Sequence, residues 1–273
     1  MANPSRSPFT PDTLGLPPPA QDVMPDPLLA KNPSSWSAKA GAILRHLVSV
    51  AKPKRKCDWR FLAIALVADF AFIGIFIAYA FAEHYGLEAS PLRGNVKFSF
   101  VDGGYPERYG YAQQVVAVLL LLATYSKRRQ PVYLMLALLF AVSVLDDSMA
   151  LHEAMGDYLS MNTGISAATG ELVGWSALGL LPMLAVLLGY LRSDPRSRRD
   201  AQVFFVAIVL LLFFAVGMDI VHSVIHQQLG RFQTVLTVVE DGGELVTFTL
   251  ICALSLGIFR LQQEPQESFT DSR

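Results

Sequence analysis

Long apolar runs separated by short polar segments dominate the chain from residue 59 onward. A helix of about 20 apolar residues is long enough to cross the roughly 30 Å hydrocarbon core of a bilayer. Six runs of about this length can be drawn, of which the second is the shortest: Trp59–Ala82, Tyr109–Tyr125, Pro131–Glu153, Glu171–Leu191, Ala201–His226 and Val235–Phe259. The pattern predicts an all-α polytopic membrane bundle of six transmembrane helices.

Basic residues flank these runs unevenly. They precede the first run, follow the second and fourth, and close the sixth, at Lys52, Lys54, Arg55, Lys56, Arg60, Lys127, Arg128, Arg129, Arg192, Arg196, Arg198, Arg199 and Arg260. The loop between Glu153 and Glu171 has no Lys or Arg. Because cytoplasmic loops carry an excess of these residues, we predict an N-in and C-in topology in a bacterial inner (cytoplasmic) membrane.

Composition divides the chain into four parts. Residues 1–37 are rich in Pro, Ser and Asp and predict a disordered cytoplasmic tail. Residues 38–57 mix Ala, Leu and Val with basic residues, which is typical of an amphipathic segment on an anionic membrane surface. Residues 58–261 form the predicted transmembrane domain, and residues 262–273 form a second cytoplasmic tail. The segment Glu83–Arg108 is expected to be an external loop or small hairpin.

The overall composition agrees with a membrane protein. Of 273 residues, 52% are hydrophobic and 16% are charged, and the mean hydropathy is +0.39, whereas soluble domains carry about 25% charged residues. Cys57 and Cys252 offer neither a disulfide framework nor a paired metal-binding spacing. Glycine-rich phosphate loops and serine-hydrolase elbows are also missing from the sequence, so nucleotide and serine hydrolysis lack support.

Acidic and histidine side chains interrupt the apolar runs. An ionised side chain at mid-bilayer costs roughly 2.5 to 3.5 kcal/mol, so such residues usually face a protein interior and serve a function. With a rise of about 1.5 Å per residue, the predicted topology brings three groups to a similar depth in the outer leaflet. They are Asp146, Asp147 and Glu153 on the third run, Asp219, His222 and His226 on the fifth, and Glu240, Asp241 and Glu244 on the sixth. Asp69 lies in the first run without an evident partner.

Helical spacing places several of these residues on common faces. On one continuous helix, Asp146 and Glu153 differ by roughly 20°, Asp147 lies at one flank, and His152 points elsewhere. Asp219, His222 and His226 fall within about 60° of one another, and Glu240 and Glu244 are neighbours one turn apart. Gly242 and Gly243 allow either close helix approach or a local break.

These faces predict a metal site. Asp219, His222 and His226 offer one oxygen and two imidazole ligands, and carboxylates from facing helices can complete one or two coordination shells, as in di-iron and di-manganese bundles. The expected ligands are Asp146, Glu153, Asp219, His222, His226, Glu240 and Glu244. Asp147 or Glu240 is the expected general base. Oxygen-rich sites with a few imidazoles favour a divalent transition metal, namely iron, manganese or zinc, with one or two ions.

Four scattered residues resemble a known superfamily. Ser143, Asp147, His222 and His226 are similar to the Ser, Asp and His-x-x-x-His residues of intramembrane metal-dependent hydrolases, which include alkaline ceramidases and progestin and adipoQ receptors. The chain departs from that pattern in having six runs instead of seven, no early-helix His at the expected place, and three extra carboxylates from Glu240 to Glu244. The resemblance serves as an analogy for reaction class and implies metal-dependent hydrolysis.

We therefore expect an integral membrane metalloenzyme that acts on a lipid or another hydrophobic small molecule, by metal-dependent hydrolysis or as a di-iron-type oxidoreductase. Membrane lipid is an expected partner, and nucleic acid is not. Two alternatives stay open: a proton, cation or metal transporter that uses Asp69, Asp146, Asp219 and Glu244, and a non-catalytic subunit of a membrane complex. The apolar inner halves of the third to fifth runs favour a one-sided site over a pathway.

Overall fold

A computed structural model describes residues 36–101, 103–218, 220–221 and 233–261. The chain divides into two units, residues 1–39 and 40–273. In the first unit the description covers residues 36–39 alone, at the start of α1, and the fold that follows belongs to the second unit.

The described residues are helical, with turns between the helices and no strand. The elements in chain order are α1 (Trp36–Ala51), α2 (Lys56–His84), the 3₁₀ helix η1 (Val96–Phe98), α3 (Tyr105–Arg128), α4 (Pro131–Met149), α5 (Leu151–Thr163), α6 (Ala167–Arg192), α7 (Pro195–Leu212), the π-helical η2 (Phe213–Met218) and α9 (Gln233–Leu261). The prediction of an all-α fold is confirmed for the described residues. Within the described part of the chain, five helices are long and apolar enough to cross a membrane: Lys56–His84, Pro131–Met149, Thr169–Arg192, Pro195–Met218 and Gln233–Leu261.

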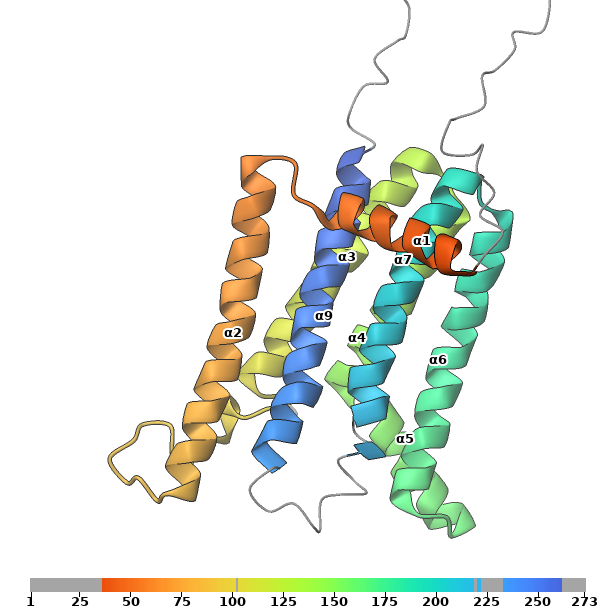
Figure 1. The fold of residues 1–273 in the computed structure, drawn as a ribbon. Coiled ribbons are helices and arrows are strands. Elements are labelled where there is room, and N and C mark those ends of the chain that lie inside the picture. The colour runs from red at the N-terminus through yellow and green to blue at the C-terminus, as the bar shows by residue number, and fades with distance from the viewer. Residues whose placement is uncertain (1–35, 102, 219, 222–232, 262–273) are drawn as a thin grey trace, which may run out of the picture. The chain divides into compact units, whose positions relative to one another are not determined.

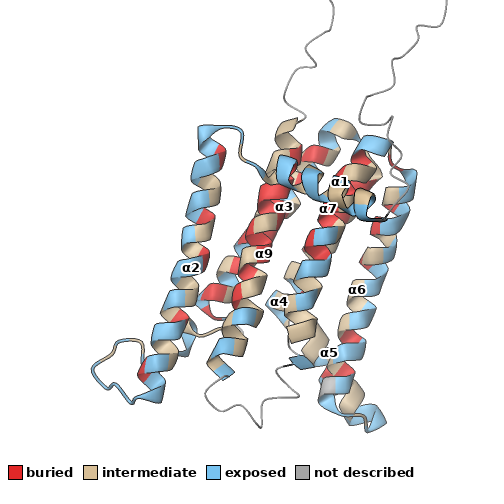
Figure 2. Cartoon of the chain, in the orientation of Figure 1, coloured by how far each residue is buried: buried red, intermediate tan, exposed pale blue. Residues whose placement is uncertain are grey.

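Helix α9 is central to the bundle, because α2, α3, α7 and η2 all pack against it, while α4 packs against α3 and α6 (Figure 1). Buried residues gather on α3, α9 and the inner face of α7, whereas α2 is mostly exposed (Figure 2). The core holds apolar side chains from six of the described helices, α1, α3, α4, α6, α7 and α9, and its large members include Leu121, Phe140, Phe204 and Leu254. Exposed apolar residues on α2 and α6 agree with helices that face lipid.

The helices alternate in direction, so their ends form two distinct groups (Figure 1). At one end, which we call the basic end, α2, α4 and α7 begin and α3, α6 and α9 finish. It carries Lys56, Arg128, Arg192 and Arg260. At the other, which we call the acidic end, α2 and α4 finish and α3 and α9 begin. Proline at the first or second helical position of α3, α4 and α7 helps to fix where these helices start.

The third predicted helix is wrong in one respect. Instead of continuing from Pro131 to Glu153, α4 ends at Met149, and Ala150 takes a left-handed conformation with φ 49° before α5 begins. Asp146 stabilises this turn, because its Oδ1 atom accepts a hydrogen bond of 2.9 Å from the backbone N–H of His152. Helix α5 then packs closely on α6, where a Cβ atom at Gly156 would lie 2.7 Å from the Glu171 nitrogen.

Residues 40–51 of α1 lie across the bundle near its basic end (Figure 1). A Cβ atom at Gly257 would lie 2.0 Å from the Val50 carbonyl oxygen, so glycine lets α1 and α9 meet backbone to backbone. The ring of His46 lies 3.0 Å from Asp200 Oδ1 on α7. Asp200 also accepts a 2.7 Å hydrogen bond from the Tyr133 hydroxyl, and it therefore joins α1, α4 and α7.

Candidate functional site at the acidic end

A cavity of about 360 Å³ opens at the acidic end between α3, α4, α5, α6, η2 and α9. Among the described residues, six carboxylate side chains from four different helices line it: Glu107, Asp147, Glu153, Glu240, Asp241 and Glu244. The imidazole of His152 lies with them. The remaining lining is largely aromatic and aliphatic, with Phe100, Trp175, Leu245 and Phe248 among its members. The cavity thus combines a strongly acidic wall with an apolar one.

Helix α9 supplies three of the carboxylates, Glu240, Asp241 and Glu244, all half-buried. The glycines between them are where neighbouring helices approach. A Cβ atom at Gly243 would lie 2.3 Å from the Phe214 ring on η2, and one at Gly242 would lie 3.0 Å from Ile73 on α2. The predicted close approach is confirmed, and the alternative of a local break is not observed, because α9 runs unbroken from Gln233 to Leu261.

Asp147 is held in the cavity wall by α3. Gln114 Nε2 donates a hydrogen bond of 3.1 Å to Asp147 Oδ2, and the Tyr111 hydroxyl lies 2.8 Å from the Asp147 carbonyl oxygen. The same hydroxyl contacts Glu107 one turn earlier on α3. Sequence reasoning did not identify Gln114, Tyr111 or Glu107 as site residues. The available signal was a pair of amides, at positions 113 and 114, inside an otherwise apolar stretch.

The break after α4 rearranges the residues that helical spacing had grouped. His152 was expected to point away from the site, yet it lines the cavity, and its Nδ1 atom lies 3.1 Å from Asp146 Oδ1. Its Nε2 atom lies 3.9 Å from Glu153 Oε1. The prediction that Asp146 and Glu153 share one helical face is wrong, because it assumed a continuous helix from Pro131 to Glu153. Asp146 is buried and fixes the turn and the imidazole, while Asp147 and Glu153 line the cavity.

Three of the predicted metal ligands, Asp219, His222 and His226, lie outside the described residues. The η2 segment that precedes them contributes Ala215 to the cavity wall. Within the described part of the chain, no group of three or more His, Cys, Asp or Glu side chains is arranged to hold a metal ion. Glu153, Glu240 and Glu244 do line the same cavity. Asp146 does not line it, but it contacts the ring of His152, which does.

Asp69 has partners that the sequence did not reveal. It is fully buried on α2, where Gln113 Nε2 donates to its Oδ1 atom at 3.0 Å and the Thr249 hydroxyl donates to its Oδ2 atom at 2.7 Å. The amide of Gln113 also donates to Thr249 Oγ1 at 2.7 Å. This polar cluster, which we call the Asp69 cluster, joins α2, α3 and α9 and does not line the cavity.

Comparison with known families matches residues 61–258, which span most of α2, all of α3 to α7, and nearly all of α9. The chain belongs to DUF8692. This family is described as a domain of unknown function, and its matched region includes every residue that lines the acidic cavity. The DUF8692 region leaves out α1 and the basic linker after it. Neither the curated proteins nor the solved structures gave a match.

Proposed function

We propose that the protein is an integral membrane metalloenzyme whose acidic cavity binds a divalent transition metal and acts on a lipid or another hydrophobic substrate. The observation that carries this proposal is the convergence of carboxylates from α3, α4, α5 and α9 on one cavity together with His152. Carboxylates in such a setting repel one another unless cations neutralise them, and hard oxygen donors with imidazole suit iron, manganese or zinc.

The proposed topology has six spans. Helix α3, with 24 residues, is the sixth span beside the five apolar ones, and its polar residues Gln113 and Gln114 turn inward to bond Asp69 and Asp147. The concentration of Lys and Arg at the basic end supports a cytoplasmic location for that end and for both termini. The acidic cavity then faces the outer side of a bacterial inner membrane.

The proposed metal ligands combine the cavity residues Glu153, Glu240 and Glu244 with Asp219, His222 and His226 from the segment after η2. A bound metal supplies Lewis acidity and lowers the pKa of a coordinated water. Asp147, fixed by Gln114, would act as general base on a water in the cavity, as would Glu240 if it does not coordinate the metal. His152, which also lines the cavity, is proposed as a further ligand, because Asp146 orients its ring through Nδ1 in the way that carboxylates position metal-binding imidazoles.

The other cavity wall supports the substrate class. Phe100, Trp175 and Phe248 offer aromatic surface within the same cavity, which suits an apolar chain or ring next to the reacting group. The acidic wall, by contrast, disfavours an anionic headgroup close to the carboxylates. We therefore propose a neutral or cationic hydrophobic substrate with an ester or amide bond, or an oxidisable carbon in the case of a di-metal oxidoreductase.

A cation or proton transporter is the second candidate, and the Asp69 cluster is the observation that favours it. A fully buried carboxylate within an apolar helix is typical of ion pathways. Against a continuous pathway, apolar side chains such as Leu121, Leu254 and Ile258 lie in the core on the basic-end side of the Asp69 cluster. A non-catalytic subunit role stays open as a third candidate.

Elemental analysis of the detergent-purified protein tests the proposal first. We expect about one to two iron, manganese or zinc ions per chain, as in carboxylate-bridged bundles. Replacing both histidines, His222→Ala with His226→Ala, should remove the metal while the protein stays folded. A metal-free native protein would rule the metalloenzyme out. Proton or cation flux in liposomes, with no bound transition metal, would favour the transporter instead.

A further inference from the structure

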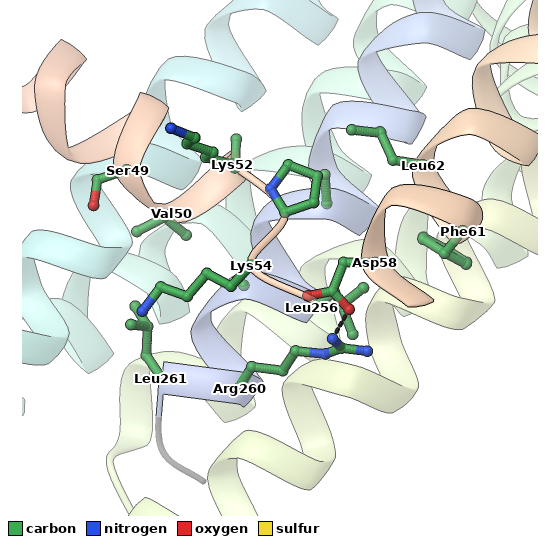
Figure 3. A pocket seen from close by; sticks show the side chains of 14 residues that line it. Ser49, Val50, Lys52, Lys54, Asp58, Phe61, Leu62, Leu256, Arg260 and Leu261 are labelled. Atoms are coloured by element: carbon green, nitrogen blue, oxygen red, sulfur yellow. Dashed lines mark ion pairs between the residues drawn. The ribbon is translucent and has the colours of Figure 1, made fainter. Parts of the chain in front are cut away.

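A second site lies at the opposite end of the bundle, where α1, the linker after it, α2 and α9 meet. Figure 3 shows a groove there that is lined by Lys52, Lys54 and Arg260 on its polar side. Val50, Phe61, Leu62, Leu256 and Leu261 provide the apolar lining. The enclosed space is only about 20 Å³, room for little more than one water, so a ligand has to lie along the open groove instead of being engulfed.

The charge of the groove favours an anion. Its carboxylate, Asp58, is buried, forms an ion pair with Arg260, and accepts a hydrogen bond of 3.2 Å from the backbone N–H of Arg55. The lining thus holds three cationic side chains, Lys52, Lys54 and Arg260, and one carboxylate. Lys52 and Lys54 are exposed, and the ion pair fixes the Arg260 guanidinium between α2 and α9 (Figure 3).

The position of the groove indicates where the anion comes from. Helices α2 and α9 are both of membrane-crossing length, and the groove lies at the start of one and the end of the other. Trp59 is 56% exposed on α2, as is typical of aromatic residues at the headgroup level. On α1, Leu44 and Val48 are exposed beside basic residues, which is typical of a helix lying in the interface.

We propose that this groove binds an anionic phospholipid of the surrounding leaflet. The lipid phosphate is held by Lys52, Lys54 and the outer edge of Arg260, and an acyl chain runs along Phe61 and Leu62 toward the membrane interior. Basic pockets beside transmembrane helices bind acidic headgroups in this way. The proposal is independent of the catalytic function of the acidic cavity, because it rests on residues at the other end of the bundle.

Tryptophan quenching by brominated lipids tests the site directly. In a variant that keeps Trp59 alone, made with Trp36→Phe and Trp175→Phe, brominated phosphatidylglycerol is compared with brominated phosphatidylcholine in mixed vesicles. We expect tighter binding of phosphatidylglycerol. Neutralising the lysines, Lys52→Gln with Lys54→Gln, should reduce that preference by roughly fivefold for each residue.

The matched control removes two basic side chains at the acidic end, Lys97→Gln with Arg108→Gln, and should keep the preference. Equal binding of the two lipids by the parent protein, or an unchanged preference after Lys52→Gln and Lys54→Gln, would overturn the proposal. Inorganic phosphate carries the same headgroup chemistry without acyl chains. It should not displace phosphatidylglycerol, and displacement would overturn the assignment to a lipid.

Discussion

Asp69 and Thr249, 180 positions apart in the chain, share a hydrogen bond of 2.7 Å in the interior of the bundle. Gln113 donates to both, so one residue from each of α2, α3 and α9 meets at this point. An unsatisfied polar group away from water costs several kcal/mol, so these contacts hold the three helices in a fixed register.

Replacing Thr249 tests how much this cluster stabilises the bundle. Thr249→Val keeps the shape of the side chain but leaves a buried Asp69 oxygen without its donor, and the free energy of unfolding in detergent should fall by about 1 to 3 kcal/mol. Thr124→Val is the matched control, because the buried Thr124 hydroxyl donates to the Leu120 carbonyl within its own helix. Equal losses in the two variants would show that the contact between helices adds nothing.

Gly243 should tolerate no larger residue. In Gly243→Ala the new methyl group would overlap the Phe214 ring, which has to move together with η2. We expect a loss of about 1 to 3 kcal/mol in unfolding free energy from this overpacking. Gly179→Ala, at a helical glycine with no atom within 4 Å of the new Cβ, should be neutral or stabilising by up to about 1 kcal/mol. Thermal unfolding of both variants checks the prediction, and a neutral Gly243→Ala would contradict the close packing.

The start of α7 should respond to pH through Asp194. Burial opposes ionisation of this carboxyl, but hydrogen bonds from the backbone N–H and hydroxyl of Ser197 outweigh it and lower the pKa of Asp194. Because the pKa of Asp194 is lower in the folded protein, the ionised carboxylate stabilises the fold at pH values above the ordinary pKa range of aspartate. This stabilisation is lost as the pH falls through the folded-state pKa of Asp194.

Two substitutions separate the cap from its charge. Asp194→Ala should cost about 1 kcal/mol of unfolding free energy at neutral pH, because the N-cap acceptor is lost. Asp194→Asn keeps an acceptor but cannot titrate, so its stability should depend less on pH than that of the parent below the aspartate range. Unfolding curves measured from neutral to acidic pH distinguish the variants, and identical pH profiles for parent and Asp194→Asn would contradict the role of the charge.

Asp146 should act through His152. In Asp146→Asn the amide oxygen can still accept the hydrogen bond from the His152 backbone N–H. The charged carboxylate that orients the His152 ring is lost. If the cavity binds metal as proposed, its affinity should fall by about 10-fold to 100-fold, measured by metal titration of the apoprotein. Asp157→Asn, at an exposed position on the same α5 helix, is the control and should leave affinity unchanged.

The long apolar runs were sufficient to predict the helices, because candidate spans such as α2 have few polar residues along their length. The α4–α5 break was not predictable from it. Neither Gly nor Pro occurs between Leu145 and Met155, and the turn at Ala150 depends on Asp146 reaching the His152 backbone. Local pattern cannot reveal such a tertiary contact.

The site was predicted only in part for a similar reason. Their similar depth in the predicted helices indicated that Asp147, Glu240 and Glu244 belong to one site, and these residues do line one cavity. Depth does not determine which side chains form hydrogen bonds with one another. The side-chain amides that donate to Asp69 and Asp147 were therefore not predicted. Gln113 and Gln114 lie in the run that was the shortest by sequence, and they interrupt its apolar pattern because they face protein instead of lipid.

Anomalous X-ray scattering from crystals of the purified protein, recorded at the absorption edge of the bound metal, tests the central claim most directly. The account predicts a peak inside the acidic cavity, within coordination distance of Glu240 or Glu244. A peak elsewhere in the molecule, or an empty cavity in protein that elemental analysis shows to carry metal, would contradict it.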